Sequence, residues 1–260
     1  RLGVEYPIFA FSHCRDVVAA VSKAGGLGVF GMNAFTDPDE IRAELDWLDA
    51  HIGNRRYGID VVIPQKHEGK GSGITDIAAF EAMLEKMIPA EHKAFRDRVL
   101  AENGVPELPA DAQRLGLLGW TETSAAPALE EALERDKCVL VANALGTPPP
   151  EVVKRIQASG RLVGALCGKI RQAMQHKDAG LDFVVAQGSE GGGHTGELGS
   201  IVLWPQIIDA VAPLPVLCAG GIANGRQMLA ALGMGAAGVW SGSLWLTAVE
   251  AAAQPAEKAL

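Results

Sequence analysis

The sequence predicts a (β/α)8 TIM barrel, an α/β fold in which eight parallel strands close on themselves inside a ring of helices. Eight short apolar runs alternate with amphipathic stretches along 260 residues, 48% of which are hydrophobic. Most of the runs are apolar throughout and rich in β-branched residues, which is typical of parallel strands buried on both faces. Glycine clusters follow the last three runs, where the loops of such proteins carry function. An open doubly wound sheet is the alternative architecture.

The elements follow in a regular order. The expected strands are Pro7–Phe11, Leu27–Phe30, Tyr57–Ile63, Cys138–Ala142, Leu162–Cys167, Phe183–Ala186, Val216–Ala219 and Gly238–Trp240. Helical patterns lie between them, over Arg15–Ala24, Asp37–His51, Thr123–Arg135, Pro149–Ser159, Lys169–Ala179, Ser200–Val211 and Asn224–Leu232. Caps and glycines mark their ends, notably Asp37 with Pro38 at one start, and Gly25, Gly160, Gly180 and Gly233 after helices. Trp245–Ala253 has the composition of a final helix, and we expect Trp240 and Trp245 to pack helix against barrel.

One long segment interrupts this alternation. Residues 65–121 exceed an ordinary connection, so we expect a barrel formed by residues 1–64 and 122–260 with a 65–121 insertion after the third strand. The insertion contains a helical pattern over Ile74–Asn103. It leaves the end of the barrel on which such enzymes place their sites, which predicts a lid over the substrate. A solubilising surface insertion is the alternative, and the basic stretch with Lys66, His67 and Lys70 fits either a solvated loop or an anion contact.

Charge and composition exclude several classes of partner. The net charge of −8 and pI near 5.3 argue against nucleic acid and anionic membrane surfaces. No apolar run is long enough to span a bilayer, and the chain does not open on a cationic segment followed by a signal core. Apolar helix faces are compatible with a homodimer. The dispersed cysteines predict reduced thiols in a cytoplasmic protein and no metal site: Cys14, Cys138, Cys167 and Cys218.

The strongest functional signal is the stretch from Gln187 to Gly196, which follows a buried strand and contains five glycines and His194. The pKa of a histidine lies near neutrality, so this imidazole is suited to general-base chemistry; a structural histidine is the alternative. Glu190 within the loop either orients His194 or caps the loop. Glycine loops also follow the seventh and eighth strands, the usual phosphate site of (β/α)8 barrels, although glycines there can simply make a tight turn.

These motifs resemble those of a known family. The segments Ala186–Gly196, Ala219–Gly225 and Ser22–Gly28 are similar to signatures of the nitronate monooxygenase (2-nitropropane dioxygenase) family of FMN-dependent (β/α)8 barrels. The resemblance implies oxidation of alkyl nitronates with O2, with His194 as the base above the flavin ring. It also implies that Gly221, Ser241 and Gly242 hold the flavin phosphate. The full set of cofactor-binding residues that it implies is Phe11, Ser12, Asp60, Gln187, Gly188, Gly192, Gly193, Gly220, Gly221, Ser241 and Gly242.

Two departures from the family pattern widen the range of activities. The first strand ends in Phe11-Ser12-His13 where Ala-Pro-Met is usual, and Asp60 stands where an asparagine commonly contacts the flavin. These segments resemble flavin oxidoreductases of steroid-ring catabolism that act on coenzyme A thioesters. His13 is either a second proton-transfer group or a packing residue, and Asp60 hydrogen-bonds the flavin or orients a neighbour.

Several activities therefore compete. An NAD(P)H-dependent flavin reductase of a coenzyme A thioester, enone or quinone is one alternative. A non-redox lyase or isomerase that binds a sugar phosphate is another, and a flavin-binding protein without catalysis is a third. Cys14 lies near the expected site, but a small buried residue fits its surroundings better than a nucleophile does.

Overall fold

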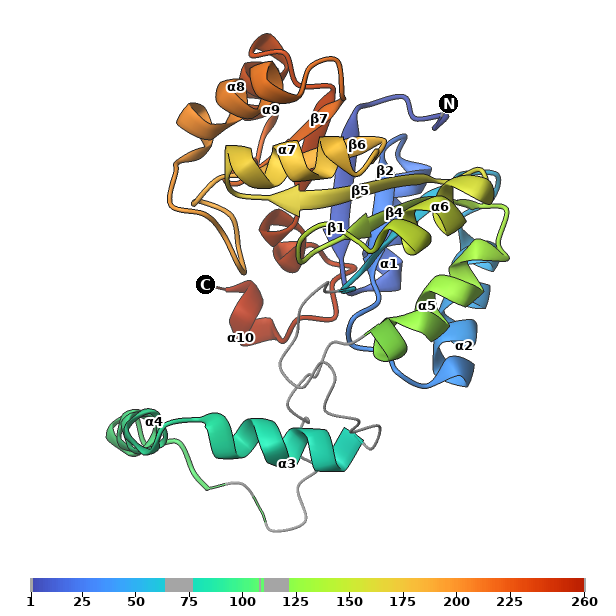
Figure 1. The fold of residues 1–260 in the computed structure, drawn as a ribbon. Helices are drawn as coiled ribbons and strands as arrows, with labels where there is room; N and C mark the ends of the chain where they lie inside the picture. The colour runs from blue at the N-terminus through green and yellow to red at the C-terminus, as the bar shows by residue number, and fades with distance from the viewer. Residues whose placement is uncertain (1, 64–76, 108, 110–121, 260) are drawn as a thin grey trace. The chain divides into compact units, whose positions relative to one another are not determined.

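The computed structural model, which describes residues 2–63, 77–107, 109 and 122–259, confirms the barrel (Figure 1). Eight parallel strands pair in chain order, and β8 pairs with β1 to close the sheet. The strands are β1 (Ile8–Ser12), β2 (Leu27–Gly31), β3 (Tyr57–Val61), β4 (Cys138–Asn143), β5 (Leu162–Cys167), β6 (Phe183–Gln187), β7 (Val216–Ala219) and β8 (Gly238–Ser241).

Helices connect the strands close to the expected positions. They are α1 (Arg15–Lys23), α2 (Pro38–His51), α5 (Glu122–Leu133), α6 (Pro150–Ala158), α7 (Ile170–Asp178), α8 (Ser200–Val211) and α9 (Gly225–Gly233). The Asp37 carboxylate accepts from the backbone N–H of Asp39 at 2.8 Å and caps α2. At the end of α9 the prediction was one residue short, because Gly233 remains helical and Gly235, with φ +99°, takes the left-handed position.

The prediction of a final helix over Trp245–Ala253 was wrong. The chain instead forms a short 3-10 helix, η1 (Ser243–Thr247), and then α10 (Pro255–Lys258). Trp240 also differs from the expectation, because it lies inside the barrel and stacks on Phe9 with ring centroids 6.5 Å apart. Alternation along β8 sends this side chain inward, whereas Trp245 packs, as expected, against the cluster between β1 and α1 that includes Ala10 and Val17.

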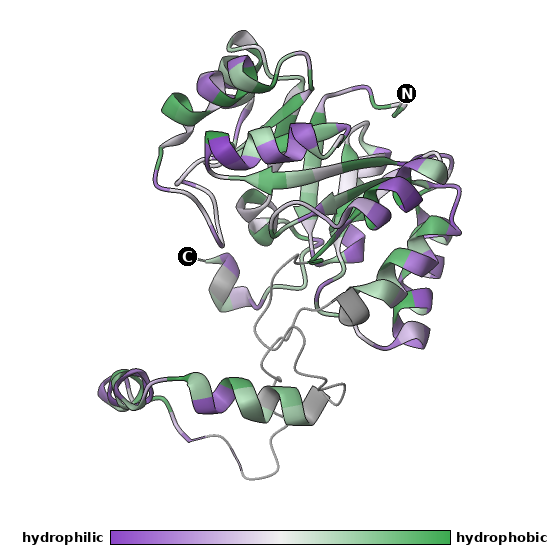
Figure 2. Cartoon of the chain, in the orientation of Figure 1, coloured by the Kyte–Doolittle hydropathy of each residue, from purple (hydrophilic) through white to green (hydrophobic). Residues whose placement is uncertain are grey.

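Apolar side chains form two layers, one inside the barrel and one between strands and helices. Figure 2 shows the strands mostly in hydrophobic colours, while the helices around them carry both kinds of residue. Interior residues include Phe9, Val29 and Leu140, whereas Tyr57 and Ile59 pack outward with the buried face of α2. This alternation fixes which side chain at each strand end faces the mouth of the barrel.

By backbone contacts the chain divides into two compact units, Arg1–Gln65 with Thr121–Leu260, and Lys66–Trp120. Within the second unit, the single helical stretch expected over Ile74–Asn103 is in fact two helices, α3 (Ile77–Met87) and α4 (Ala90–Glu102). Pro89, with ψ 144°, separates them, since a proline lacks the N–H and disfavours the α region in the residue before it. Lys66, His67 and Lys70 lie outside the described residues.

Candidate active site at the C-terminal mouth of the barrel

The glycine-rich segment after β6 folds back on itself. Gln187 Nε2 donates to the carbonyl oxygen of Gly192 at 2.9 Å, and the N–H of Gly191 donates to Gly188 at 3.0 Å. A Cβ added to Gly188 would lie 2.5 Å from the backbone nitrogen of Ser200, so α8 begins directly against this loop. The absence of a side chain at Gly188 is therefore a packing requirement.

Ser200 joins this loop to the next one. The Glu190 carboxylate accepts from the N–H of Ser200 at 2.8 Å, while Ser200 Oγ lies 2.8 Å from Glu190 Oε2 and 2.9 Å from the Gly220 carbonyl oxygen. The hydrogen bond from the Ser200 hydroxyl is the largest influence on Glu190 and lowers the pKa of its carboxyl. Glu190 thus binds the first N–H of α8, and the hydrogen bonds of the described residues include none between Glu190 and His194.

The loop after β7 uses glycine for its backbone shape. Gly220 and Gly221 have φ +104° and +70°, and a Cβ on Gly220 would lie 2.6 Å from Ser200 Oγ. The start of α9 is capped reciprocally by Asn224 and Gln227, whose side chains bind the N–H groups of residues 223, 224, 226 and 227. These N–H groups are taken, so an anion at this loop would meet the glycine backbone rather than the capped turn of α9.

The loop after β8 lies close to the loop after β6 and to the end of β1. A Cβ on Gly192 would lie 2.9 Å from Ser243 Oγ, and a Cβ on Gly242 would lie 3.5 Å from the ring of Phe11 on β1. Trp245 Nε1 donates to Ser241 Oγ at 3.1 Å, which leaves the hydroxyl proton of buried Ser241 available to another acceptor. Gly221, Ser241 and Gly242, the residues predicted to bind the phosphate, therefore lie at the end of β8 or on the adjoining loops after β7 and β8.

The end of β1 carries a histidine in a fixed orientation. His13 Nδ1 lies 3.1 Å from the carbonyl oxygen of Gly31 and must donate to it, so in the neutral imidazole Nε2 is the acceptor nitrogen. A Cβ on Gly31 would lie 2.6 Å from His13 Nδ1, so the glycine makes room for the ring. Phe11 packs edge-on against His13 at 5.0 Å and stacks on Trp240 at 6.3 Å. Ser12 Oγ accepts from the N–H of Cys14 at 3.1 Å.

His194 is placed differently from the other candidates. Its side chain is exposed on the loop after β6, and no hydrogen bond among the described residues involves it. Gly193 beside it has φ +76°, with open space where a side chain would be. The imidazole is therefore available to a ligand at the mouth.

Two residues that fix the loops of the site, Ser200 and Asn143, were missed in the sequence. Ser200 links three segments, yet a serine at a helix start gives no such signal in sequence. Buried Asn143 at the end of β4 accepts from Ile63 N at 2.7 Å and donates to Gly146 O at 2.8 Å, fixing the loop that follows. Cys14 Sγ donates to the Glu250 carbonyl oxygen at 3.1 Å and packs against the C-terminal segment.

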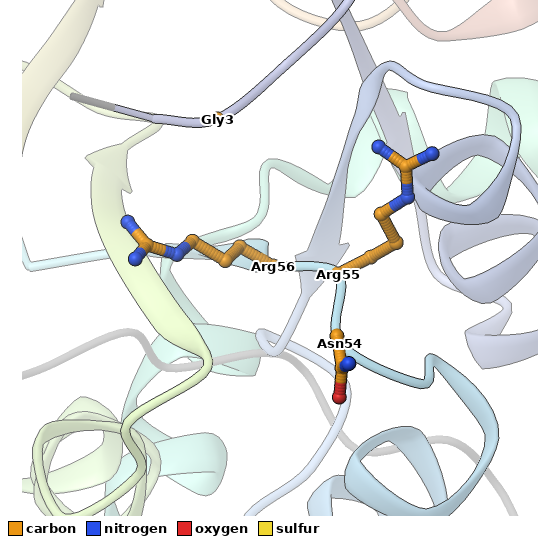
Figure 3. Close-up of a pocket in the computed structure, with 4 residues that line it drawn as sticks. All are labelled: Gly3, Asn54, Arg55 and Arg56. Carbon is orange, nitrogen blue, oxygen red and sulfur yellow. The ribbon is translucent and has the colours of Figure 1, made fainter.

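Among the described residues, one cavity lies far from the glycine loops and another lies beside the loop after β7. A cavity of about 540 Å3 is lined by Gly3, Asn54, Arg55 and Arg56, which precede β1 and β3 and so belong to the opposite end of the barrel (Figure 3). Figure 3 shows the two arginine side chains pointing away from one another, without the convergent polar groups of a binding site. A second cavity of about 660 Å3 adjoins the start of α9.

Within the described ranges, no three His, Cys, Asp or Glu side chains are placed to hold a metal ion. None of the helices in those ranges is long and apolar enough to cross a membrane. All four cysteines are free, and burial raises the pKa of Cys138, Cys167 and Cys218 to about 12.

The comparison with known families covers nearly the whole chain. A family model described as nitronate monooxygenase matches residues 4–260. The chain belongs to the nitronate monooxygenase family. Membership places it among flavin-dependent oxidoreductases, in agreement with the motif resemblance.

Individual relatives agree with this assignment. A candidate monooxygenase of Mycobacterium tuberculosis, Rv1533, is 47% identical over 260 residues, which is 99% of this chain and 68% of that protein. A candidate nitronate monooxygenase of Staphylococcus aureus is 29% identical over 95% of this chain and 66% of its own length. The chain therefore spans about two thirds of the length of these curated relatives.

Solved structures show the same architecture. Nitroalkane oxidase from Streptomyces ansochromogenes superposes with a TM-score of 0.74 at 25% identity, covering 99% of this chain and 70% of that one. FabK from Thermotoga maritima superposes with a TM-score of 0.70 at 24% identity, covering 99% and 64%. The latter likeness shows the shared barrel fold alone.

The residues at the mouth fit a flavin. Three adjoining loops present glycine backbone where a phosphate would bind, and Asp60 Oδ2 is buried at the end of β3 without a partner among the described residues. A buried polar atom of this kind calls for a hydrogen-bonding group from a ligand or water.

Proposed function

We propose that the chain forms the catalytic barrel of an FMN-dependent oxidoreductase that oxidises alkyl nitronates with O2. The observation that carries the proposal is the link from Glu190 through Ser200 to Gly220, which holds the two glycine loops after β6 and β7 together. The loop after β8 adjoins them through Ser243. Backbone N–H groups of such loops suit a monoester phosphate, which favours FMN as the flavin.

Roles follow from the positions of the side chains. Gly221, Ser241 and Gly242 would hold the phosphate, while Gln187 and Gly192 would lie along the cofactor. The flavin supplies the electron acceptor of the reaction. His194 is exposed and carries no described hydrogen bond, so its imidazole can take a proton from a carbon acid bound over the ring.

His13 and Asp60 favour a second candidate, because they add two ionisable groups to the mouth. That candidate is an NAD(P)H-dependent reductase of a coenzyme A thioester, enone or quinone. Its substrate carbonyl would need a proton as the flavin delivers hydride, and an acid at the mouth could supply it. A coenzyme A ester would also require cationic side chains to bind its phosphates. In the sequence, Lys66, His67 and Lys70 are candidates for this contact.

The two candidates differ in what reduces the flavin. Anaerobic mixing of the FMN-loaded protein with a nitronate should bleach the flavin rapidly under the first proposal, and mixing with NADH or NADPH should do so under the second. A neutral nitroalkane must lose its α-proton before it is oxidised, so His194→Asn should slow flavin reduction by the nitroalkane about 10²- to 10⁴-fold through loss of a general base. His51→Asn is the matched control, since His51 lies on α2 and stacks on Trp47. Equal rates in the two variants would remove His194 from the mechanism.

A further inference from the structure

Asp60 faces the interior of the barrel at its C-terminal rim. Tyr57, Ile59 and Val61 on β3 pack outward in the layer beneath the helices, so the intervening Asp60 points inward. Its neighbours in register are Gly31 on β2 and Ala142 on β4, and Ala142 belongs to the apolar interior. Gly31 also binds His13, so Asp60 adjoins the candidate site.

The surroundings of Asp60 disfavour a charge. The residue is 2% exposed, and its Oδ2 has no hydrogen-bond partner among the described residues. The ion pairs of those residues do not include Asp60, and both register neighbours are uncharged. An ionised carboxylate without water or a cation is far costlier than a neutral acid, and burial raises the pKa of this carboxyl well above its usual range.

We propose that Asp60 is a carboxylic acid whose O–H donates a hydrogen bond to an acceptor atom on the flavin ring. The proposal rests on the proposed function, because that function places the ring at the mouth of the barrel. An oxidised flavin ring offers several acceptors, its carbonyl oxygens and unprotonated nitrogens, but only one N–H. A neutral O–H at the rim therefore complements the ring and satisfies the unpartnered oxygen.

A neutral donor and a carboxylate would act on the flavin in opposite ways. A carboxylate would repel the electron-rich reduced ring and make reduction harder, whereas a neutral acid holds the ring in both states. Asparagine has the shape of the acid, carries no charge and retains a donor. Asp60→Asn is therefore the diagnostic variant, and Asp60→Ala removes the donor altogether.

Cofactor binding and flavin potential test the ring contact. We expect Asp60→Asn to bind FMN within about threefold of the wild-type affinity, and Asp60→Ala to bind it about tenfold or more weakly. The potential of bound flavin in Asp60→Asn should change by less than the roughly 30 mV that corresponds to a tenfold effect on a two-electron couple. Wild-type affinity in Asp60→Ala would overturn the contact, and a larger rise in potential for Asp60→Asn would overturn the neutral state.

The protonation state can be measured without flavin. The infrared difference spectrum between the flavin-free wild type and Asp60→Asn should contain the C=O band of a protonated carboxylic acid at pH 7. A carboxylate band in its place would overturn the proposal. Circular dichroism and thermal unfolding of each variant establish that it is folded. If the wild type binds no FMN, the proposed function and the ring contact both fail, while the infrared result still reports on the acid.

Discussion

The Glu190 carboxylate accepts two hydrogen bonds from Ser200, from its backbone N–H at 2.8 Å and its hydroxyl at 2.8 Å. The same hydroxyl shares its single proton with the Gly220 carbonyl oxygen, which lies 2.9 Å away. The first residue of α8 thereby holds two loops that come from different strands. If the cofactor phosphate binds those loops, its affinity should depend on a serine that need not touch it.

Ser200→Ala should therefore weaken FMN binding by about tenfold, because it removes a partly buried hydrogen bond to a carboxylate and loosens the two loops. Ser159→Ala is the control, since the Ser159 hydroxyl donates to the Ile156 carbonyl oxygen at the end of α6. Fluorescence titration with FMN would compare them. Equal affinities in the two variants would show that Ser200 does not organise the site.

The lowered pKa of Glu190 predicts a pH dependence of stability. The folded-state pKa lies below the unfolded value of 4.5, so the stabilisation is present above pH 4.5 and is lost as pH falls through the folded-state pKa. Glu190→Gln removes this contribution. Urea unfolding at pH 6 and pH 3 should therefore show a smaller pH-dependent loss of unfolding free energy in the variant. Identical losses in both proteins would argue against the carboxylate cap.

A pair of glycine substitutions tests the close approach of α8. Gly188→Ala would bring a methyl group 2.5 Å from Ser200 N, and such overpacking costs about 1–3 kcal/mol. Gly233→Ala has open space and a helical backbone, so it should stabilise by about 0.4–1 kcal/mol. Thermal unfolding distinguishes them. A tolerated Gly188→Ala would mean that the loop can move away from α8.

His13 can be tested with two amide side chains that mimic its two nitrogens. Asparagine can retain a donor near Nδ1 for the Gly31 carbonyl but lacks Nε2, whereas glutamine can place a polar group near Nε2. If Nε2 transfers a proton, His13→Asn should slow flavin reduction by the productive substrate about 10²-fold while preserving the fold, and His13→Gln should not restore it. Unchanged rates in His13→Asn would assign the ring a packing role.

The strands could be predicted from sequence because each is a short apolar run with a clear end. Leu162–Cys167 and Val216–Ala219 have the expected bounds. Strand order then brings the loops after β6, β7 and β8 side by side, so the glycine clusters predict adjoining loops. The break at Pro89 was missed because the helical pattern continues on both sides of it, and Trp240 was misjudged because four residues of β8 give too short an alternation to fix its phase.

The remainder of the site depends on contacts between distant residues. Gly31 gives no sequence signal, yet its carbonyl sets the tautomer of His13 eighteen positions earlier. A serine at the first position of a helix is common, so Ser200 could not be recognised in the sequence as a residue that links two loops. Whether the Asp60 carboxyl has a hydrogen-bond partner depends on its neighbours on β2 and β4. These neighbours are known only once the strands are paired in the sheet.

The most direct test of the central claim is the visible spectrum of the purified protein before and after addition of FMN. A flavoprotein built on these loops should show bound-flavin absorbance, retain it through gel filtration and saturate at one FMN per chain. A colourless protein that retains no added FMN would contradict the assignment of the loops after β6, β7 and β8 as a flavin site.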